Sequence, residues 1–191
     1  MERGRLGARG IVVLGLLGAL LVVLQVAMAL LPNIEPVSLL VMVYTAVLGR
    51  RAAYPIAVFV ALEALIWGVS TWVLSYLYVW AVLAVLAWLL RGMESRVGWA
   101  VLSGAFGLAF GALCALVYLP VGGWQMFAAT WVAGIPFDLL HGAGNFAIAL
   151  VLFICSPLLA RLLAPTYTPV MTARLSAYLR TFSWTLIPLV W

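Results

Sequence analysis

The placement of arginine constrains this chain more than any other feature of its sequence. All ten basic residues are arginines, and each lies outside the long apolar runs. Six such runs can be marked, at residues 11–31, 37–49, 52–68, 73–90, 98–118 and about 134–160. Hydrophobic residues make up 68% of the chain and charged residues 8%, and roughly 20 apolar helical residues cross a bilayer core. The runs therefore predict an integral membrane protein.

The arginines also predict how the runs cross the membrane. They precede the first run, separate the second from the third and the fourth from the fifth, and follow the sixth. Since basic loops stay in the cytoplasm, six spans with both termini cytoplasmic would place all ten arginines on one side. Helices are the expected spans, because lipid leaves backbone groups no external partner. We predict an all-α integral membrane protein with six transmembrane helices in residues 1–165 and an amphipathic interfacial tail in residues 166–191.

Three other patterns bear on this prediction. The basic start and first run resemble a secretory signal, but residues 11–31 exceed its usual apolar core of roughly 7–15 residues. The run at 37–49 has only 13 residues, so neighbouring helices must shield it or the polar stretch before it must extend it. The basic pI of about 9.7 does not indicate nucleic-acid binding, because the arginines follow the topology.

Polar residues within the apolar runs are the first candidates for function, because ionisable groups are costly in lipid. Asp138, His141 and Asn145 share one helical face in the sixth run, and Glu63 lies in the third. In one interpretation Asp138 caps a helix that begins at Pro136, while His141 and Asn145 form interhelical hydrogen bonds. In a second, the face lines a ligand cavity opposite Glu63. In a third, the group is catalytic or conducts protons.

Aromatic residues are concentrated in the connections predicted to face outward, 69–80 and 118–131. They fit an interfacial belt, but their excess on one side also fits an aromatic-lined pocket open to the outside. The candidate ligand contacts are Asn33, Glu35, Glu63, Trp67, Trp72, Tyr76, Tyr78, Trp124, Asp138, His141 and Asn145.

Small residues form two further faces, with Gly107 and Gly111 in the fifth run and Gly15 and Ala19 in the first. Such faces let helices approach closely, either within the chain or against another membrane protein. The sequence has no phosphate-binding GxxxxGK[ST] loop, so no ATP site of its own is expected. A single histidine with scattered acids is a poor metal site, and we expect neither a metal nor a cofactor.

Three stretches together resemble a known family: LPNIEPVSLLVMVYTAVLG (31–49), YLYVW (76–80) and GIPFDLLHGAGNF (134–146). They are similar to the membrane-embedded S components of energy-coupling factor (ECF) transporters, over most of residues 11–160. The resemblance implies a six-helix, multi-pass protein of a prokaryotic plasma membrane. It implies a vitamin-like micronutrient bound near the outer face and covered by residues 32–36.

The resemblance also implies partners, a T component and two ATP-binding subunits, in addition to the membrane lipid. The family carries an alanine-x-x-x-alanine docking motif in its first helix, where this chain has Gly15 and Ala19. The protein is then not an enzyme. Because the outer half carries acids but no arginine or lysine, we predict a neutral or weakly cationic ligand.

Two alternatives stay open. An intramembrane enzyme would use Glu63, Asp138 and His141, and would need them within hydrogen-bonding reach and a path for water. A membrane assembly subunit without a small ligand would have no cavity between the outer ends of the third and sixth runs.

Overall fold

The computed structural model describes residues 7–30, 34, 36–93 and 95–152. Across these residues the chain is helical and has no strand, which confirms the predicted all-α class. Four helical stretches are long and apolar enough to cross a membrane, which indicates a multi-pass membrane protein. The elements are α1 (Ala8–Ala27), α2 (Val37–Leu48), the 3₁₀ helix η1 (Gly49–Ala52), α3 (Ala53–Trp67), α4 (Thr71–Leu89), α5 (Arg96–Ala115), the 3₁₀ helix η2 (Leu116–Tyr118) and α6 (Leu119–Leu152).

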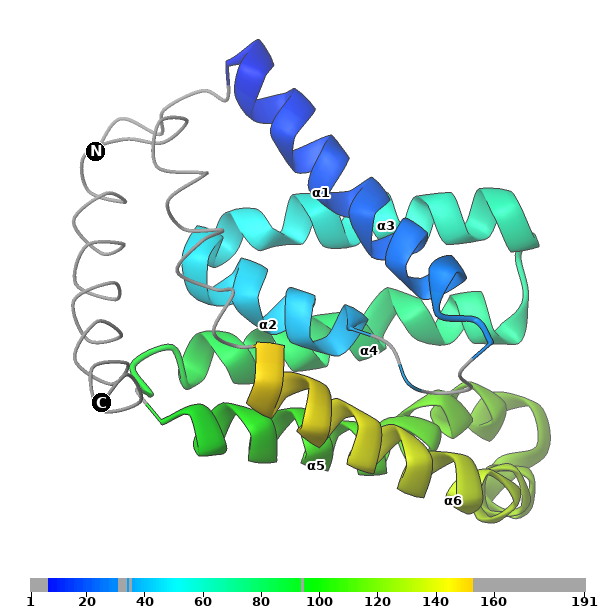
Figure 1. The fold of residues 1–191 in the computed structure, drawn as a ribbon. Helices are drawn as coiled ribbons and strands as arrows, with labels where there is room; N and C mark the ends of the chain where they lie inside the picture. Colours follow the sequence, from blue (N-terminus) through cyan, green and yellow to red (C-terminus); the bar gives the residue numbers. More distant parts are fainter. Residues whose placement is uncertain (1–6, 31–33, 35, 94, 153–191) are drawn as a thin grey trace.

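The short helix α2 lies in the middle of the bundle. It passes between α1 and the α4–α5 layer (Figure 1), and nine of its 12 residues are buried. The Tyr44 hydroxyl donates a hydrogen bond of 3.1 Å to the carbonyl of Leu17, which ties α2 to α1. Of the two alternatives for this short run, shielding by its neighbours is therefore the one observed.

Helices α3 and α4 form an antiparallel pair joined by a tight connection at Gly68 (Figure 1). Gly68 has a φ of 76°, which favours glycine because other residues are strained there. Helix α1 crosses α3 at Gly18, where a Cβ atom would lie 2.6 Å from the Cβ of Val58. The absence of a side chain at Gly18 thus allows α1 and α3 to touch.

Helices α5 and α6 pack along each other through glycines. A Cβ atom at Gly107 would lie 2.8 Å from the Cα of Gly142, and one at Gly104 would lie 3.2 Å from the Gly142 carbonyl oxygen. The small-residue face of the fifth run is therefore occupied by α6. Of the two alternatives, contact within the chain and contact with another membrane protein, the structure shows the first. A Cβ atom at Gly15 on α1 would have nothing within 4 Å.

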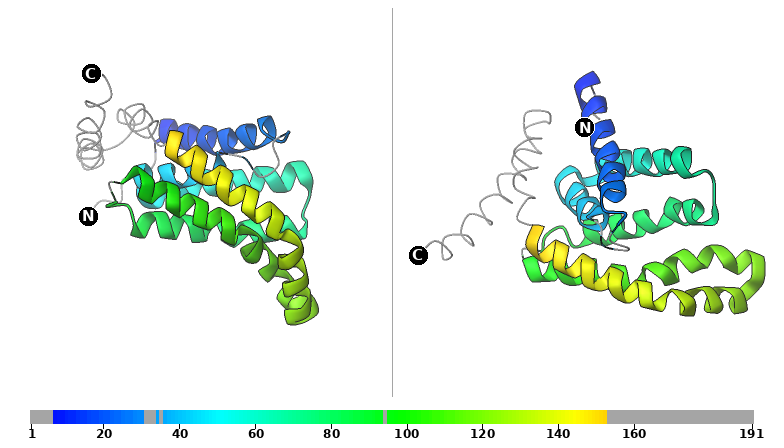
Figure 2. Two further views of the ribbon diagram at one scale, coloured as in Figure 1. Left: turned by 60° about the horizontal axis from the view of Figure 1, so that its bottom comes forward. Right: turned by 45° about the vertical axis from the view of Figure 1, so that its right-hand side comes forward.

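Helix α6 differs from the prediction. The stretch 118–131 was expected to be a connection, but within α6 (Leu119–Leu152) the break is confined to Gly122 and Gly123, and the helical segment after it contains Pro136 in its interior. The helical geometry is interrupted locally at Gly122 and Gly123. Between Gly123 and Pro136 the chain is helical without a further break. At Pro136 the helix lacks one backbone hydrogen-bond donor, and such a proline kinks a helix. Figure 2 shows the beginning of α6 projecting beyond the other helices. Residues 153–160 of the sixth run and the tail 166–191 lie outside the described residues.

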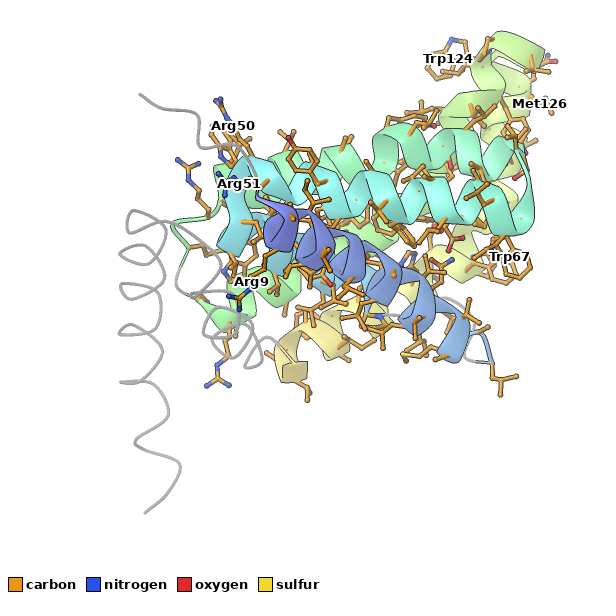
Figure 3. All side chains as sticks on the ribbon, turned by 90° about the horizontal axis from the view of Figure 1, so that it is seen from above. Arg9, Arg50, Arg51, Trp67, Trp124 and Met126 are labelled. Atoms are coloured by element: carbon orange, nitrogen blue, oxygen red, sulfur yellow. The ribbon has the colours of Figure 1, made fainter. Side chains whose placement is uncertain are left out.

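Three arginines and two tryptophans mark opposite ends of the bundle. Figure 3 places Arg9, Arg50 and Arg51 at one end, with Trp67 and Trp124 at the other. Arg9 lies at the start of α1 and the other two arginines lie in η1 between α2 and α3. The one-sided placement inferred from the sequence is therefore seen for these three arginines.

Candidate functional site

The polar face of α6 is buried in the bundle. Asp138 is 6% exposed, His141 2% and Asn145 1%, and their spacing of three and four residues puts them on one side of the helix. Pro136 does not begin a helix, because the helical segment that contains it already begins after the break at Gly122 and Gly123. The interpretation in which Asp138 caps a helix start is therefore wrong, and its carboxylate is used elsewhere.

Asp138 contacts the backbone of α5. Its Oδ1 atom accepts a hydrogen bond of 2.8 Å from the Gly111 amide. A Cβ atom at Gly111 would lie 2.8 Å from the Asp138 Cγ, closer than side chains approach, so the contact depends on glycine. The other carboxylate oxygen, Oδ2, is buried and has no hydrogen-bond partner among the described residues.

Asn145 connects three helices. Its Nδ2 atom donates to the Ser38 hydroxyl of α2 at 3.0 Å and to the Ser103 carbonyl of α5 at 3.4 Å. Its Oδ1 atom and the Ser103 hydroxyl are buried without a partner in the described chain. The amide therefore holds the start of α2 against α5 and α6 and leaves one acceptor unused.

A chain of ring contacts leads from His141 across the bundle. The His141 ring lies 4.6 Å from that of Phe110 on α5, and Phe110 lies 5.7 Å from Trp80 on α4. Trp80 lies 5.7 Å from Phe59 on α3. With Tyr76, 5.2 Å from Trp80, and Phe106, 6.0 Å from it, these rings form a layer shared by α3, α4 and α5. We call Phe59, Tyr76, Trp80, Phe106 and Phe110 the aromatic layer.

Glu63 lies on the α3 side of the aromatic layer. It follows Phe59 by four residues, so the two side chains share a helix face, and it is fully buried. Neither of its carboxylate oxygens has a hydrogen-bond partner in the part of the chain described. Glu63 lies ten residues after Ala53, the first residue of α3, which is roughly 15 Å along the helix. Its position is thus well removed from the arginines of η1.

Unpartnered polar atoms gather on both sides of the aromatic layer. A buried polar atom without a hydrogen bond costs about 1–3 kcal/mol, so most proteins contain few. Such a group combines acceptors, donors and planar apolar side chains, which are residue types that also line small-molecule sites. These atoms are both Glu63 oxygens, Trp80 Nε1, Ser103 Oγ, Asp138 Oδ2, both His141 ring nitrogens and Asn145 Oδ1.

The structure brings together only part of the predicted set. Glu63, Tyr76, Asp138, His141 and Asn145 are buried around the aromatic layer, and Trp72 touches it through Tyr76, with ring centroids 4.5 Å apart.

The remaining predicted residues lie elsewhere. Tyr78 donates a hydrogen bond of 2.7 Å to the Leu113 carbonyl of α5. Trp67 and Trp124 are 59% and 72% exposed, and the Trp124 ring packs edge to face against Phe127, with centroids 5.5 Å apart. Asn33 and Glu35 lie outside the described residues.

The sequence did not single out Phe59, Phe106, Phe110, Ser38 or Ser103, and it placed Trp80 in the aromatic belt but not in the site. The signal that could have found the rings is their spacing of four residues. Phe59 precedes Glu63, Tyr76 precedes Trp80 and Phe106 precedes Phe110 by one turn each. The serines carry no such signal, because their role depends on which helices meet.

Glu63, Asp138 and His141, the three groups that an intramembrane enzyme would use, form no hydrogen bonds with one another in the described residues. No hydrogen bond from Glu63 or His141 reaches any described residue, and the one from Asp138 goes to the Gly111 amide. General acid–base catalysis places such groups within hydrogen-bonding reach of the reacting atom, directly or through one water. The geometry instead offers separate polar groups along a layer of rings.

Comparison with protein-family models, with curated proteins and with solved structures gave no match to this chain.

Proposed function

We propose that this protein is the substrate-binding membrane subunit of an ECF-type importer. The observation that carries the proposal is the gathering of unpartnered polar atoms around the aromatic layer, inside a helical bundle suited to lipid. Buried polar groups in lipid are retained where they serve a ligand or a pathway. The resemblance of residues 31–49, 76–80 and 134–146 to ECF S components gives this ligand site its class.

The site chemistry supports a neutral or weakly cationic, ring-containing ligand. Glu63 and Asp138 offer carboxylate oxygens, Trp80 offers an N–H donor, and His141 offers a ring nitrogen of either kind. The rings of Tyr76, Trp80 and Phe110 provide flat apolar walls on which a planar ligand can stack. Arg50 and Arg51 lie at the far end of the bundle (Figure 3), so a strongly anionic ligand would gain no counter-charge from them.

The proposal includes a topology and partners. The protein crosses a prokaryotic plasma membrane six times with both termini in the cytoplasm, on the arginine side. A T component and two ATP-binding subunits supply energy. The face of Gly15 and Ala19 on α1 is the proposed docking surface, because a Cβ atom at Gly15 would meet nothing within 4 Å and small faces suit helix docking.

The first experiment is mass spectrometry of small molecules that co-purify with the protein, followed by thermal unfolding against a panel of micronutrients. We expect one neutral or weakly cationic compound to raise the Tm of the wild type. Glu63→Gln and Asp138→Asn should lose most of this shift, since each replaces a buried acceptor.

Trp124→Ala is the matched control, because Trp124 is exposed and lies outside the site. It should keep the full ligand-induced shift. A dianionic compound as the best stabiliser would contradict the ligand class. Turnover of a compound by the purified protein alone would contradict a transport role.

A further inference from the structure

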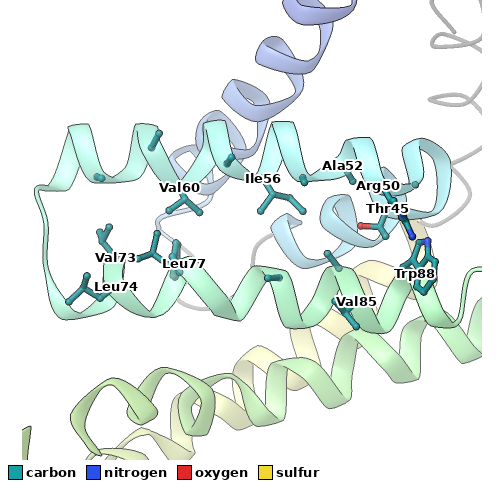
Figure 4. A pocket seen from close by; sticks show the side chains of 18 of the residues that line it. Thr45, Arg50, Ala52, Ile56, Val60, Val73, Leu74, Leu77, Val85 and Trp88 are labelled. Carbon is teal, nitrogen blue, oxygen red and sulfur yellow. The ribbon is translucent and has the colours of Figure 1, made fainter. Parts of the chain in front are cut away.

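A second feature adjoins the aromatic layer at Tyr76 and lies between α3 and α4. A groove of about 790 Å³ runs between these helices (Figure 4). Small side chains form much of its floor. These are Ala53, Ala57, Ala61 and Ala64 on α3, with Ala81 and Ala84 on α4.

One end of the groove is cationic. Arg50 and Trp88 line it there, opposite the end formed by Val73 and Leu74 (Figure 4). The guanidinium of Arg91 lies 4.4 Å from the centre of the Trp88 ring, and its Nη1 atom donates a hydrogen bond of 2.6 Å to the Trp88 carbonyl. Two exposed guanidinium groups thus flank this end, and each has N–H donors in the fork geometry that suits phosphate.

The length of the groove bears on what can occupy it. The floor from Ala53 to Ala64 covers 12 residues, and the rise from the first to the last is roughly 17 Å of helix. This is close to one leaflet of the hydrocarbon core, about 15 Å. An acyl chain from the arginine-side leaflet therefore matches the groove in length.

The apolar walls alone would not select a lipid, because bilayer tails are as apolar as the groove. Selection must come from the headgroup, where charge-assisted bonds from arginine to phosphate are strong. We propose that the groove between α3 and α4 is a binding site for an anionic phospholipid of the arginine-side leaflet, with its tail along the alanines and its headgroup at Arg50 and Arg91. This proposal does not depend on the proposed transport function.

The test uses the full-length protein in vesicles of equimolar phosphatidylglycerol and phosphatidylcholine. After mild detergent extraction, native mass spectrometry counts the lipids that stay bound. Each basic residue near a membrane surface contributes about fivefold in affinity for an anionic lipid. We expect phosphatidylglycerol to be enriched roughly fivefold to 25-fold over phosphatidylcholine, and Arg50→Gln to reduce the enrichment about fivefold.

Two further variants separate this site from general charge effects. Arg9→Gln removes an arginine from the same end of the bundle but outside the groove (Figure 3), and should leave the enrichment unchanged. Ala57→Leu fills the groove from an exposed position, so folding should be unaffected and bound lipid should fall. Equal losses with Arg9→Gln and Arg50→Gln would overturn the proposal. If bound lipid did not fall in Ala57→Leu, the lipid would not lie in the groove, and the proposal would be overturned. The groove would then be free for another occupant, such as a partner helix, a second copy or residues 153–191.

Discussion

The carboxylate of Asp138 on α6 accepts a hydrogen bond from the Gly111 amide on α5, at 2.8 Å. The contact joins an acidic side chain to a helix backbone in the interior of a bundle suited to lipid. It satisfies one oxygen of the carboxylate and leaves the other without a partner in the described residues. The glycine at position 111 is therefore part of how the site is built.

Gly111→Ala should displace Asp138. The added Cβ would lie 2.8 Å from the Asp138 Cγ, and overpacking of this kind costs about 1–3 kcal/mol. We expect a lower Tm in detergent and a weaker ligand-induced shift. Gly134→Ala on α6 is the control, since its Cβ would have nothing within 4 Å. Equal Tm values for the two variants would contradict this expectation, because they would mean that the Asp138 carboxylate makes room for the new Cβ without cost.

Gly18→Ala should loosen α1 from α3, because the new Cβ would lie 2.6 Å from the Val58 Cβ and 2.8 Å from the Pro55 carbonyl oxygen. Gly15→Ala, three residues earlier on the same helix, meets nothing within 4 Å. Thermal unfolding should separate the pair, with a drop for Gly18→Ala and no loss for Gly15→Ala. A drop for Gly15→Ala would mean that its face is already covered.

The hydrogen bond from Asn145 to Ser38 can be measured by a double-mutant cycle. The cycle uses Asn145→Ala, Ser38→Ala and the double variant, with the free energy of unfolding in mixed detergent as the readout. Interhelical hydrogen bonds in membranes average about 0.6 kcal/mol and reach about 1.7 kcal/mol. We expect a coupling in this range. Simple additivity of the two single variants would argue that α2 is held by packing alone.

Ser103→Ala should leave stability unchanged or raise it by up to about 1 kcal/mol. The buried Ser103 hydroxyl has no partner in the part of the structure described, so removing it removes a desolvation cost. Thr45→Val is the matched comparison, because the Thr45 hydroxyl donates to the Val41 carbonyl at 2.8 Å. It should lower the free energy of unfolding. Loss of ligand binding in a fully stable Ser103→Ala protein would assign the hydroxyl to the ligand.

Single cysteines can test the proposed topology in a background without Cys114 and Cys155. An impermeant maleimide added to intact cells should label Ser70→Cys, which lies in the exposed connection between α3 and α4. Arg50→Cys should react only after the membrane is opened. Labelling of both positions from the same side would contradict a crossing by α3.

Much of the helical arrangement follows from the sequence, because it depends on local chemistry. The shielding of the run at 37–49 was predictable from its length, and the clustering of Arg9 with Arg50 from the positive-inside rule. The two glycines at 122 and 123 mark a break that the structure contains. That the chain is helical on both sides of this break was not predictable in this way, because tertiary packing decides where a helix resumes.

The polar residues of the site could be predicted from the sequence, but the aromatic residues beside them could not. Glu63, Asp138 and His141 stand out because lipid penalises them, whereas Phe59 and Phe110 look like ordinary apolar residues. Gly111 shows the limit most clearly. Its spacing from Gly107 indicates a close helix contact, but spacing cannot tell that the neighbour is a carboxylate of the same chain.

The length of α2 has a consequence for biogenesis. Its 12 residues rise roughly 18 Å, well short of the roughly 30 Å of hydrocarbon in a bilayer. Lipid cannot retain such a segment, and nine of its residues are covered by protein. Its retention in the membrane therefore depends on the helices packed around it, so α2 belongs to the bundle only once those helices have assembled.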